Sequence, residues 1–284
     1  DVYKRQVKLQ YFLSPDAQVY GGYSRGFKSG GIGMDPEAGG GQPSGLNSPL
    51  LLALAGIGNG TGFADLEDPT YDPEYVDAWE VGLKSQFLQG AGRLNIAAFY
   101  NDIEDNQFTV FSGTGFRVLN ASDAEVLGVE IESDYAVTPH LRLGGALTWL
   151  DTEFGDDIPE PAPPGRDLTL APEWAGNISL DYERSLGDNL AGFFSANWSY
   201  RDEQYLSYDI QDKQPDYDLL GLQLGLRAAD GTWDIRVWCD NCLDEYYAVG
   251  YFNQPFYFDD DLGQFQGQFP GTPRTWGVTL RLEH

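Results

Sequence analysis

The sequence predicts an all-β fold, an antiparallel transmembrane β-barrel to which this chain contributes about eleven strands. Three observations predict it. Apolar and polar residues alternate along segments near the roughly 9–11 residues that cross a bilayer at a tilt. The connections between these segments are alternately short and long, as they are at the two rims of a membrane barrel. The sequence contains no run of about 18 apolar residues, the length that would predict a transmembrane helix.

The first three strands show both signals. Lys8–Leu13 and Gln18–Phe27 are joined only by Ser14, Pro15 and Asp16, whereas a long, Gly-rich link leads from Lys28 to the third strand, Tyr75–Phe87. Side chains alternate between the two faces of a strand. In the third strand one face is apolar, with Tyr75, Trp79, Val81, Leu83 and Phe87. The other face carries Glu80, Gly82, Lys84 and Gln86.

The remaining strands repeat the pattern. They are expected near residues 93–101, 127–135, 141–149, 174–182, 190–200, 220–226, 233–237 and 276–282. In the second of these, Glu130, Glu132 and Asp134 share a face, and three carboxylates cannot face lipid. We therefore expect Glu80, Lys84, Glu130 and Glu132 to line a polar barrel interior.

Composition excludes several function classes. The net charge of −27 argues against a nucleic-acid partner, whose affinity rests on basic residues. The two histidines, His140 in a tight turn and His284 at the end of the chain, are poorly placed for catalysis, so we expect no enzyme and no cofactor. Zinc would need ligands beyond Cys239 and Cys242.

The two cysteines have C-x-x-C spacing. Residues three apart in an extended strand point to opposite faces and lie about 10 Å apart, too far for a disulfide. A bridge would require a turn at Asp240 and Asn241. We expect inert thiols at Cys239 and Cys242, with a strained disulfide as the second alternative.

Two long connections are candidates for ligand binding. The last, about residues 250–271, combines aromatic side chains that could cover a flat chelate with carboxylates that could bridge a cation: Tyr251, Phe252, Phe256, Tyr257, Asp259, Asp260 and Asp261. The alternative is a solvated loop. The acidic, Pro-rich connection from about Asp151 to Asp167 leaves the same two alternatives for Asp151, Glu153, Asp156 and Asp157.

Five segments, in order along the chain, resemble motifs of the TonB-dependent outer-membrane receptors. The stretch from Tyr20 to Gly31, which begins in the second strand, is similar to their mid-barrel motif. Further similarities follow at Tyr71–Glu74 with Trp79–Lys84, at Gly128–Glu132, at Asn241–Tyr247, and at Pro273–Gly277. Cys242 stands where the family has an apolar residue, and the chain ends without the terminal aromatic. The family's assembly signal still fits Thr275, Gly277, Leu280 and Leu282.

The resemblance implies more than the alternation does. A plugged transporter barrel has about 22 strands, so residues 1–284 would form its C-terminal half, and residues 1–6 are interpreted as a non-native leader. The plug domain, the TonB box and the N-terminal half of the barrel would lie outside this chain. The implied function is TonB-energised uptake of a ferric siderophore or similar scarce solute through the Gram-negative outer membrane. The implied partners are the plug, TonB through that plug, the ligand, membrane lipid and lipopolysaccharide. The alternatives are a passive porin-like channel and a soluble, secreted β-rich binding protein.

Overall fold

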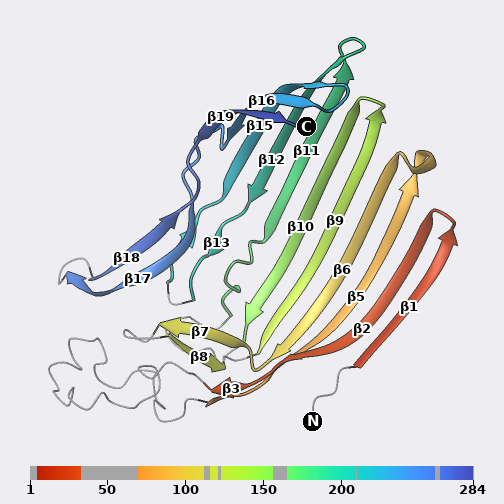
Figure 1. The fold of residues 1–284 in the computed structure, drawn as a ribbon. Coiled ribbons are helices and arrows are strands. Elements are labelled where there is room, and N and C mark those ends of the chain that lie inside the picture. The colour runs from red at the N-terminus through yellow and green to blue at the C-terminus, as the bar shows by residue number, and fades with distance from the viewer. Residues whose placement is uncertain are drawn as a thin grey trace.

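The computed structural model describes residues 5–32, 70–111, 116–120, 123–155, 165–208, 210–259 and 263–283. Eleven strands form one antiparallel sheet in which every strand pairs with its neighbours in sequence (Figure 1). They are β1 (Arg5–Ser14), β2 (Ala17–Lys28), β5 (Glu74–Phe87), β6 (Gly92–Glu104), β9 (Ala124–Thr138), β10 (Leu141–Phe154), β11 (Trp174–Ser185), β12 (Leu190–Arg201), β15 (Tyr217–Ala228), β16 (Trp233–Asp240) and β19 (Thr275–Leu282). The eleven expected strands are confirmed, several of them longer than their sequence pattern indicated.

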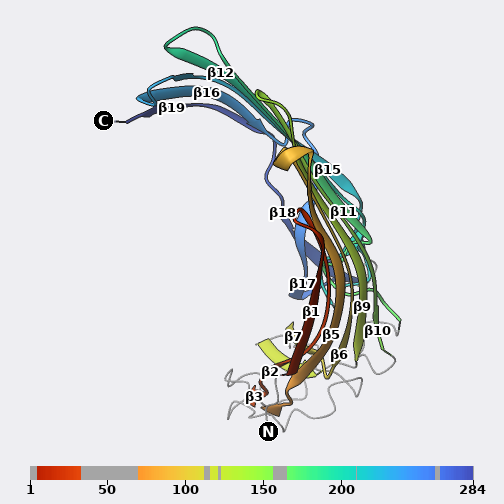
Figure 2. The same cartoon turned by 90° about the vertical axis from the view of Figure 1, so that its right-hand side faces the viewer.

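The sheet is a single curved wall, seen along its edge in Figure 2. Its apolar face carries large side chains that no other layer covers, among them Val81, Ile178, Leu224 and Trp276, the last 76% exposed. The opposite, polar face carries the carboxylates that the sequence placed there, since Glu80 and Glu130 alternate with Val81 and Val129 along their strands. No helix among the described residues is long and apolar enough to cross a membrane.

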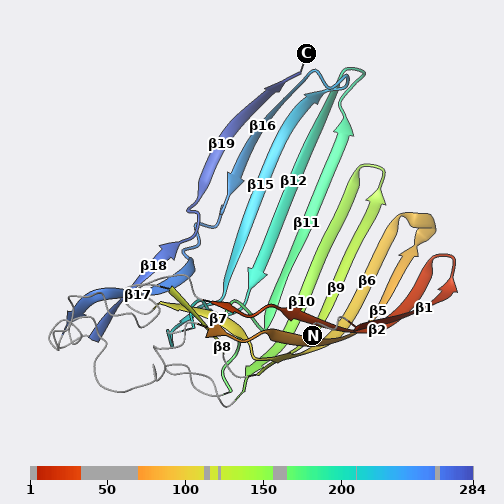
Figure 3. The same ribbon diagram turned by 60° about the horizontal axis from the view of Figure 1, so that its bottom comes forward.

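The two rims differ as expected. Tight connections join β1 to β2, β5 to β6, β9 to β10, β11 to β12, and β15 to β16 at one rim, where the described chain also ends (Figure 1). The connection from β5 to β6 includes the short 3₁₀ turn η1 (Leu88–Gly90). The long connections gather at the opposite rim (Figure 3). This rim is called the loop rim below.

Four small two-stranded sheets are built from the long connections. They pair β3 (Gly31–Ile32) with β4 (Thr70–Tyr71), β7 (Gln107–Phe111) with β8 (Phe116–Asn120), β13 (Gln204–Tyr205) with β14 (Lys213–Gln214), and β17 (Ala248–Asp259) with β18 (Gly263–Pro270). The long loop expected at about residues 250–271 is, for the most part, the β17–β18 hairpin. The β7–β8 hairpin was not predicted.

Glycines on the polar face lie beneath aromatic rings. Tyr20 pairs with Gly82, Phe99 with Gly128, Phe193 with Gly225, and Trp238 with Gly277. A Cβ atom added at any of these glycines would lie 2.3–2.6 Å from its partner's ring. The ring of each pair therefore occupies the space above the glycine, an arrangement that stabilises glycine in a sheet by cross-strand packing.

Candidate functional site

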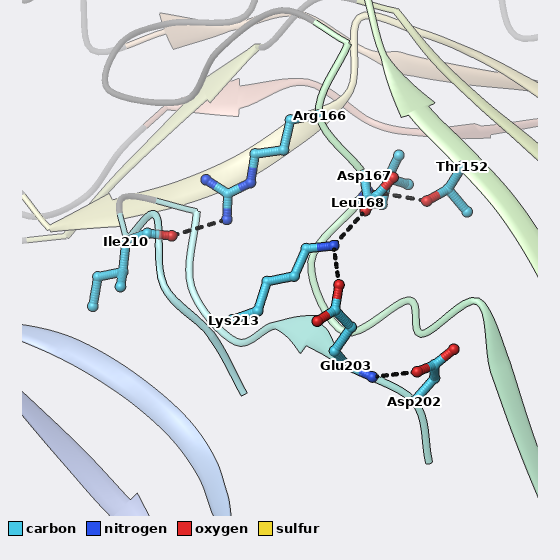
Figure 4. Close-up of polar contacts among 8 residues, drawn as sticks. All are labelled: Thr152, Arg166, Asp167, Leu168, Asp202, Glu203, Ile210 and Lys213. Carbon is cyan, nitrogen blue, oxygen red and sulfur yellow. Dashed lines mark hydrogen bonds and ion pairs between the residues drawn. The ribbon is translucent and has the colours of Figure 1, made fainter. Parts of the chain in front are cut away.

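The best-ordered polar arrangement at the loop rim is centred on Arg166, which is only 4% exposed. Its Nη1 donates to the Tyr208 carbonyl at 2.6 Å, and its Nη2 donates to the carbonyls of Ser207 and Ile210 at 2.7 and 3.1 Å. The guanidinium also stacks over the Tyr205 ring at 3.7 Å from its centroid. One buried side chain thus contacts Tyr205, residues 207–208 and Ile210, as Figure 4 shows for the bond to Ile210.

Arg166 is itself held against the end of β10. The Phe154 amide donates to the Arg166 carbonyl at 2.9 Å, and the Leu168 amide donates to Thr152 Oγ1 at 3.1 Å. The connection between β10 and β11 therefore bonds to β10 before β11 begins at Trp174. Through Arg166, the loop residues around Tyr208 are thus held in a fixed position relative to the sheet.

Lys213 joins two acidic segments next to Arg166 (Figure 4). Its Nζ lies 3.2 Å from Asp167 Oδ2 and 3.1 Å from Glu203 Oε1, and 4.9 Å from the centroid of the Tyr205 ring. Partial burial opposes the charge, but the hydrogen bonds to Glu203 and Asp167 outweigh it and raise the pKa of Lys213 above its usual 10.5. The ammonium stays charged at neutral pH. We call Arg166, Asp167, Glu203, Gln204, Tyr205, Lys213 and Gln214 the rim cluster.

Two buried glutamines complete the rim cluster. Gln214, 4% exposed, accepts from the Ala248 amide at 2.8 Å and from the Tyr251 hydroxyl at 3.4 Å, so it connects β14 to the β17–β18 hairpin. Gln204, 3% exposed, has a side-chain oxygen with no hydrogen-bond partner in the described part of the chain. A buried acceptor left without a donor is costly to the fold.

Aromatic contacts extend this order along the rim. Tyr208 lies 4.4 Å from Phe108 of β7 and 6.5 Å from Phe154 of β10, measured between ring centroids. At the other end Tyr217 stacks on Tyr247 at 4.6 Å. Phe154 and Ala124 also form the buried apolar cluster of the molecule, with Ile103, Leu168 and Tyr208 packed against it.

The β7–β8 hairpin is held at its base by two amide side chains. The Gln107 amide nitrogen donates to the carbonyls of Ser29 and Asp72 at 3.2 and 2.8 Å. The Asn120 amide nitrogen donates to the carbonyls of Asp72 and Asp105 at 3.0 and 2.8 Å. Both side chains satisfy backbone groups that belong to no strand ladder, which fixes the hairpin to the ends of β2 and β5.

The predicted ligand residues fall into three groups. Tyr251 joins the rim cluster through Gln214, and burial together with Asp212 and Tyr246 raises the pKa of its hydroxyl. Phe252, the next residue, instead packs on Phe269 at 5.0 Å. Phe256, Tyr257 and Asp259 lie in β17, where the structure describes the backbone alone, and Asp260 and Asp261 lie outside the described residues.

The second acidic cluster is not in a loop, as far as the structure describes it. Asp151 and Glu153 belong to β10 and alternate with Thr152 and Phe154, which places them on the apolar face of the wall. Asp156 and Asp157 lie outside the described residues. Asp151 and Glu153 therefore point away from the face on which Thr152 accepts from the Leu168 amide.

The polar face of the wall has its own cluster around Glu80. The Tyr20 hydroxyl donates to Glu80, and the ring of Tyr20 lies 4.9 Å from Lys8 Nζ and 5.3 Å from Lys84 Nζ. Glu80 and Glu130 line the same cavity of about 310 Å³. Glu132 accepts from Asn95 at 3.3 Å. The wall thus brings together the four residues predicted to be polar and interior.

The structure corrects the expectation for the cysteines. Cys239 and Cys242 form a disulfide, with Cα atoms 5.6 Å apart. The strand ends at Asp240, and Asn241 takes a positive φ of 48°, so the chain turns where a bridge requires it to turn. The Asn241 side chain secures this turn by donating to the carbonyls of Glu245 and Thr272 at 2.7 and 3.1 Å.

The proposed assembly-signal residues divide between the two faces of β19. Leu280 and Leu282 are exposed on the apolar face, while Thr275 and Gly277 alternate with them on the polar face. Gly277 accommodates the Trp238 indole, whose Nε1 donates to Thr279 at 3.1 Å. Gly277 therefore has a packing role in addition to its place in the motif.

Sequence reasoning missed the rim cluster. The signal that could have found it is charge contrast, because Arg166 is the single basic residue among many carboxylates between residues 151 and 173. The described residues contain no group of three or more His, Cys, Asp or Glu side chains suited to hold a metal ion. The rim cluster and the aromatic rings beside it offer stacked rings and paired charges, which suit binding rather than catalysis.

Comparison with known proteins agrees with the fold. Residues 5–242 match the family model of the TonB dependent receptor-like β-barrel. The metal-pseudopaline receptor CntO of Pseudomonas aeruginosa strain UCBPP-PA14 is 28% identical over 122 residues, 43% of this chain and 17% of that protein.

Solved receptors share the fold over nearly the whole chain. The ferric yersiniabactin uptake receptor FyuA from Yersinia pestis superposes with a TM-score of 0.74 at 20% identity, covering 98% of this chain and 36% of its own. The siderophore receptor PiuA from Acinetobacter baumannii gives 0.66 at 15% identity, covering 98% and 35%. The chain spans about a third of the length of these receptors. It belongs to the TonB-dependent receptor β-barrel family, which is made up of transport receptors.

Proposed function

We propose that the protein containing this chain takes up a ferric siderophore or a similar metal chelate across the Gram-negative outer membrane, energised by TonB. The observation that supports it most directly is the rim cluster, which holds long connections in fixed positions around Arg166 and Lys213. A passive channel needs no such fixed surface, whereas a receptor gains affinity from binding groups that are ordered in advance.

The proposal assigns parts to the two faces of the wall. The apolar face contacts outer-membrane lipid and, toward the loop rim, lipopolysaccharide. The polar face, with Glu80, Lys84, Glu130 and Glu132, contacts a plug domain encoded outside this chain. TonB acts on that plug, and the ligand binds between the plug and the loop rim.

Charge at the rim favours one class of ligand. Around Arg166 and Lys213 lie the carboxylates of Asp167, Asp202 and Glu203, so negative charge exceeds positive charge there. A strongly anionic chelate would be repelled on approach. We therefore propose a chelate of low negative charge that stacks on the rim aromatics.

The experiment is growth of a strain lacking the complete gene on iron supplied with chelators of different charge. We expect growth loss on weakly charged ferric chelates and rescue by the gene. Glu203→Gln in the complete receptor should lower uptake of the same chelate with the protein still in the membrane. Unchanged growth on every iron, cobalamin and glycan source tested would rule out the transport role.

A further inference from the structure

A groove of about 650 Å³ lies on the apolar face, near the rim of tight turns, and crosses β11, β12, β15 and β16. Apolar side chains line most of it: Tyr182, Leu186, Phe194, Leu224, Leu226 and Ile235. Gly192 adds no side chain to its floor, and a Cβ atom there would lie 3.0 Å from Leu186 Cδ1, so a larger residue would have to displace Leu186 into the groove. The volume is within the range of about 300–1,000 Å³ seen for small-ligand pockets.

Arg184 lies in this groove and differs from the other basic residues near the tight-turn rim. In register, Arg184 is opposite Gly192 and shares the apolar face with Tyr182 and Phe194. The basic residues at comparable height lie on the polar face by alternation: Lys84, Arg93, Arg142, Arg227, Arg236 and Arg281. Arg142 and Arg227 have carboxylate partners there, Asp134 and Glu183.

The Arg184 side chain is exposed and forms no ion pair or hydrogen bond with any residue that the structure describes. A cation on an apolar surface of a membrane protein is costly unless its charge reaches the interface or an anion. Arg184 is the next-to-last residue of β11, close to the turn at residues 186–189, which lets its guanidinium reach the level of lipid headgroups.

We propose that this groove binds one glycerophospholipid of the periplasmic leaflet, with an acyl chain along the apolar wall and the phosphate on Arg184. Guanidinium and phosphate form paired, charge-assisted hydrogen bonds. Tyr182 supplies a ring of the kind enriched at membrane interfaces. The occupant should be anionic, because Arg184 brings a positive charge to the apolar face of the groove and has no carboxylate partner among the described residues. The inference rests on the outer-membrane location given under the proposed function.

The test is native mass spectrometry of the complete receptor in detergent, titrated with palmitoyl-oleoyl phosphatidylglycerol or with lipid A. We expect the wild type to retain one phosphatidylglycerol in preference to lipid A. Arg184→Gln should weaken the apparent affinity about tenfold, the loss typical of one charged hydrogen-bonded contact. Arg93→Gln removes the same charge from the polar face and should change nothing. Gly192→Leu fills the groove and should lower retention with Arg184 intact.

Three results would overturn the proposal: equal retention by wild type and Arg184→Gln, equal loss in Arg184→Gln and Arg93→Gln, or a preference for lipid A. Resistance of the unheated protein to unfolding on a gel confirms that each variant is folded before it is titrated. Lipid retention is read without transport, so a receptor that fails to take up chelated iron but retains phosphatidylglycerol refutes the proposed function and leaves this site standing.

Discussion

The pairing of Phe99 with Gly128 gives the most exact prediction for the wall. The two residues face each other across β6 and β9, on the polar face. A Cβ atom at Gly128 would lie 2.3 Å from Phe99 Cζ and 2.8 Å from its Cε atoms. Carbon atoms in contact need about 3.5–4.0 Å, so the ring must withdraw by more than about 1 Å or leave its rotamer. We expect Gly128→Ala to destabilise the complete receptor by about 1–3 kcal/mol, the usual cost of overpacking.

The control is Gly26→Ala, in β2. Nothing lies within 4 Å of a Cβ atom added there. Alanine in a strand restricts the unfolded chain more than glycine does, so Gly26→Ala should be neutral or stabilise by up to about 1 kcal/mol. The assay is the urea concentration at which half of the unheated receptor loses its folded gel mobility.

A double substitution isolates the cause. If the ring is what the new methyl group meets, Gly128→Ala should cost nothing once Phe99→Ala has removed that ring. The reasoning fails if Gly128→Ala is no more destabilising than Gly26→Ala, or if its cost persists in the Phe99→Ala background. Either result would mean that the glycine is required by the backbone of β9 and not by the ring above it.

Three further predictions concern the loop rim. Arg166→Lys keeps the charge but loses the planar set of donors that binds the segment 205–210. In the folded receptor this segment should then become cleavable by a nonspecific protease. The control Lys28→Arg, also near this rim, should leave the segment protected. The pKa of Lys213 is raised above 10.5, so the stability that its charge contributes is complete below pH 10.5 and is lost as the pH rises through the folded-state pKa. In the wild type, protection of the same segment from protease should fall over that pH range. Lys213→Met has no titrating group at this position and should not show the fall. Cys239 and Cys242 should resist maleimide labelling until a reductant is added, and immediate labelling would show free thiols.

The wall could be predicted from sequence because the pattern that forms each strand lies within a short stretch of neighbouring residues. Each strand has one apolar and one polar face, so apolar and polar residues alternate along its sequence. Strand existence, order and face therefore followed from segments such as Tyr75–Phe87. The last residues of β16, Trp238 to Asp240, were missed because they carry no clear alternation.

The rim hairpins were missed because their signals are irregular or distant. The register of β17 and β18 shifts between Asn253 and Phe258, a stretch that contains Pro255 and its missing N–H group, so no period of two survives there. The β7–β8 hairpin is held through Gln107, whose partners lie at Ser29 and Asp72. Contacts across tens of residues leave no trace in a local pattern.

The same contrast explains why the rim cluster has a core of its own. A single-layered wall has no interior of its own, and the apolar side chains of its strands remain exposed, from Val81 to Trp276. A fixed binding surface at the rim of such a wall therefore needs buried side chains of its own. The buried residues Phe154, Ile210 and Arg166 supply that packing at the loop rim. Arg166 and Leu168 join this small core to the wall through hydrogen bonds with Phe154 and Thr152, where β10 ends.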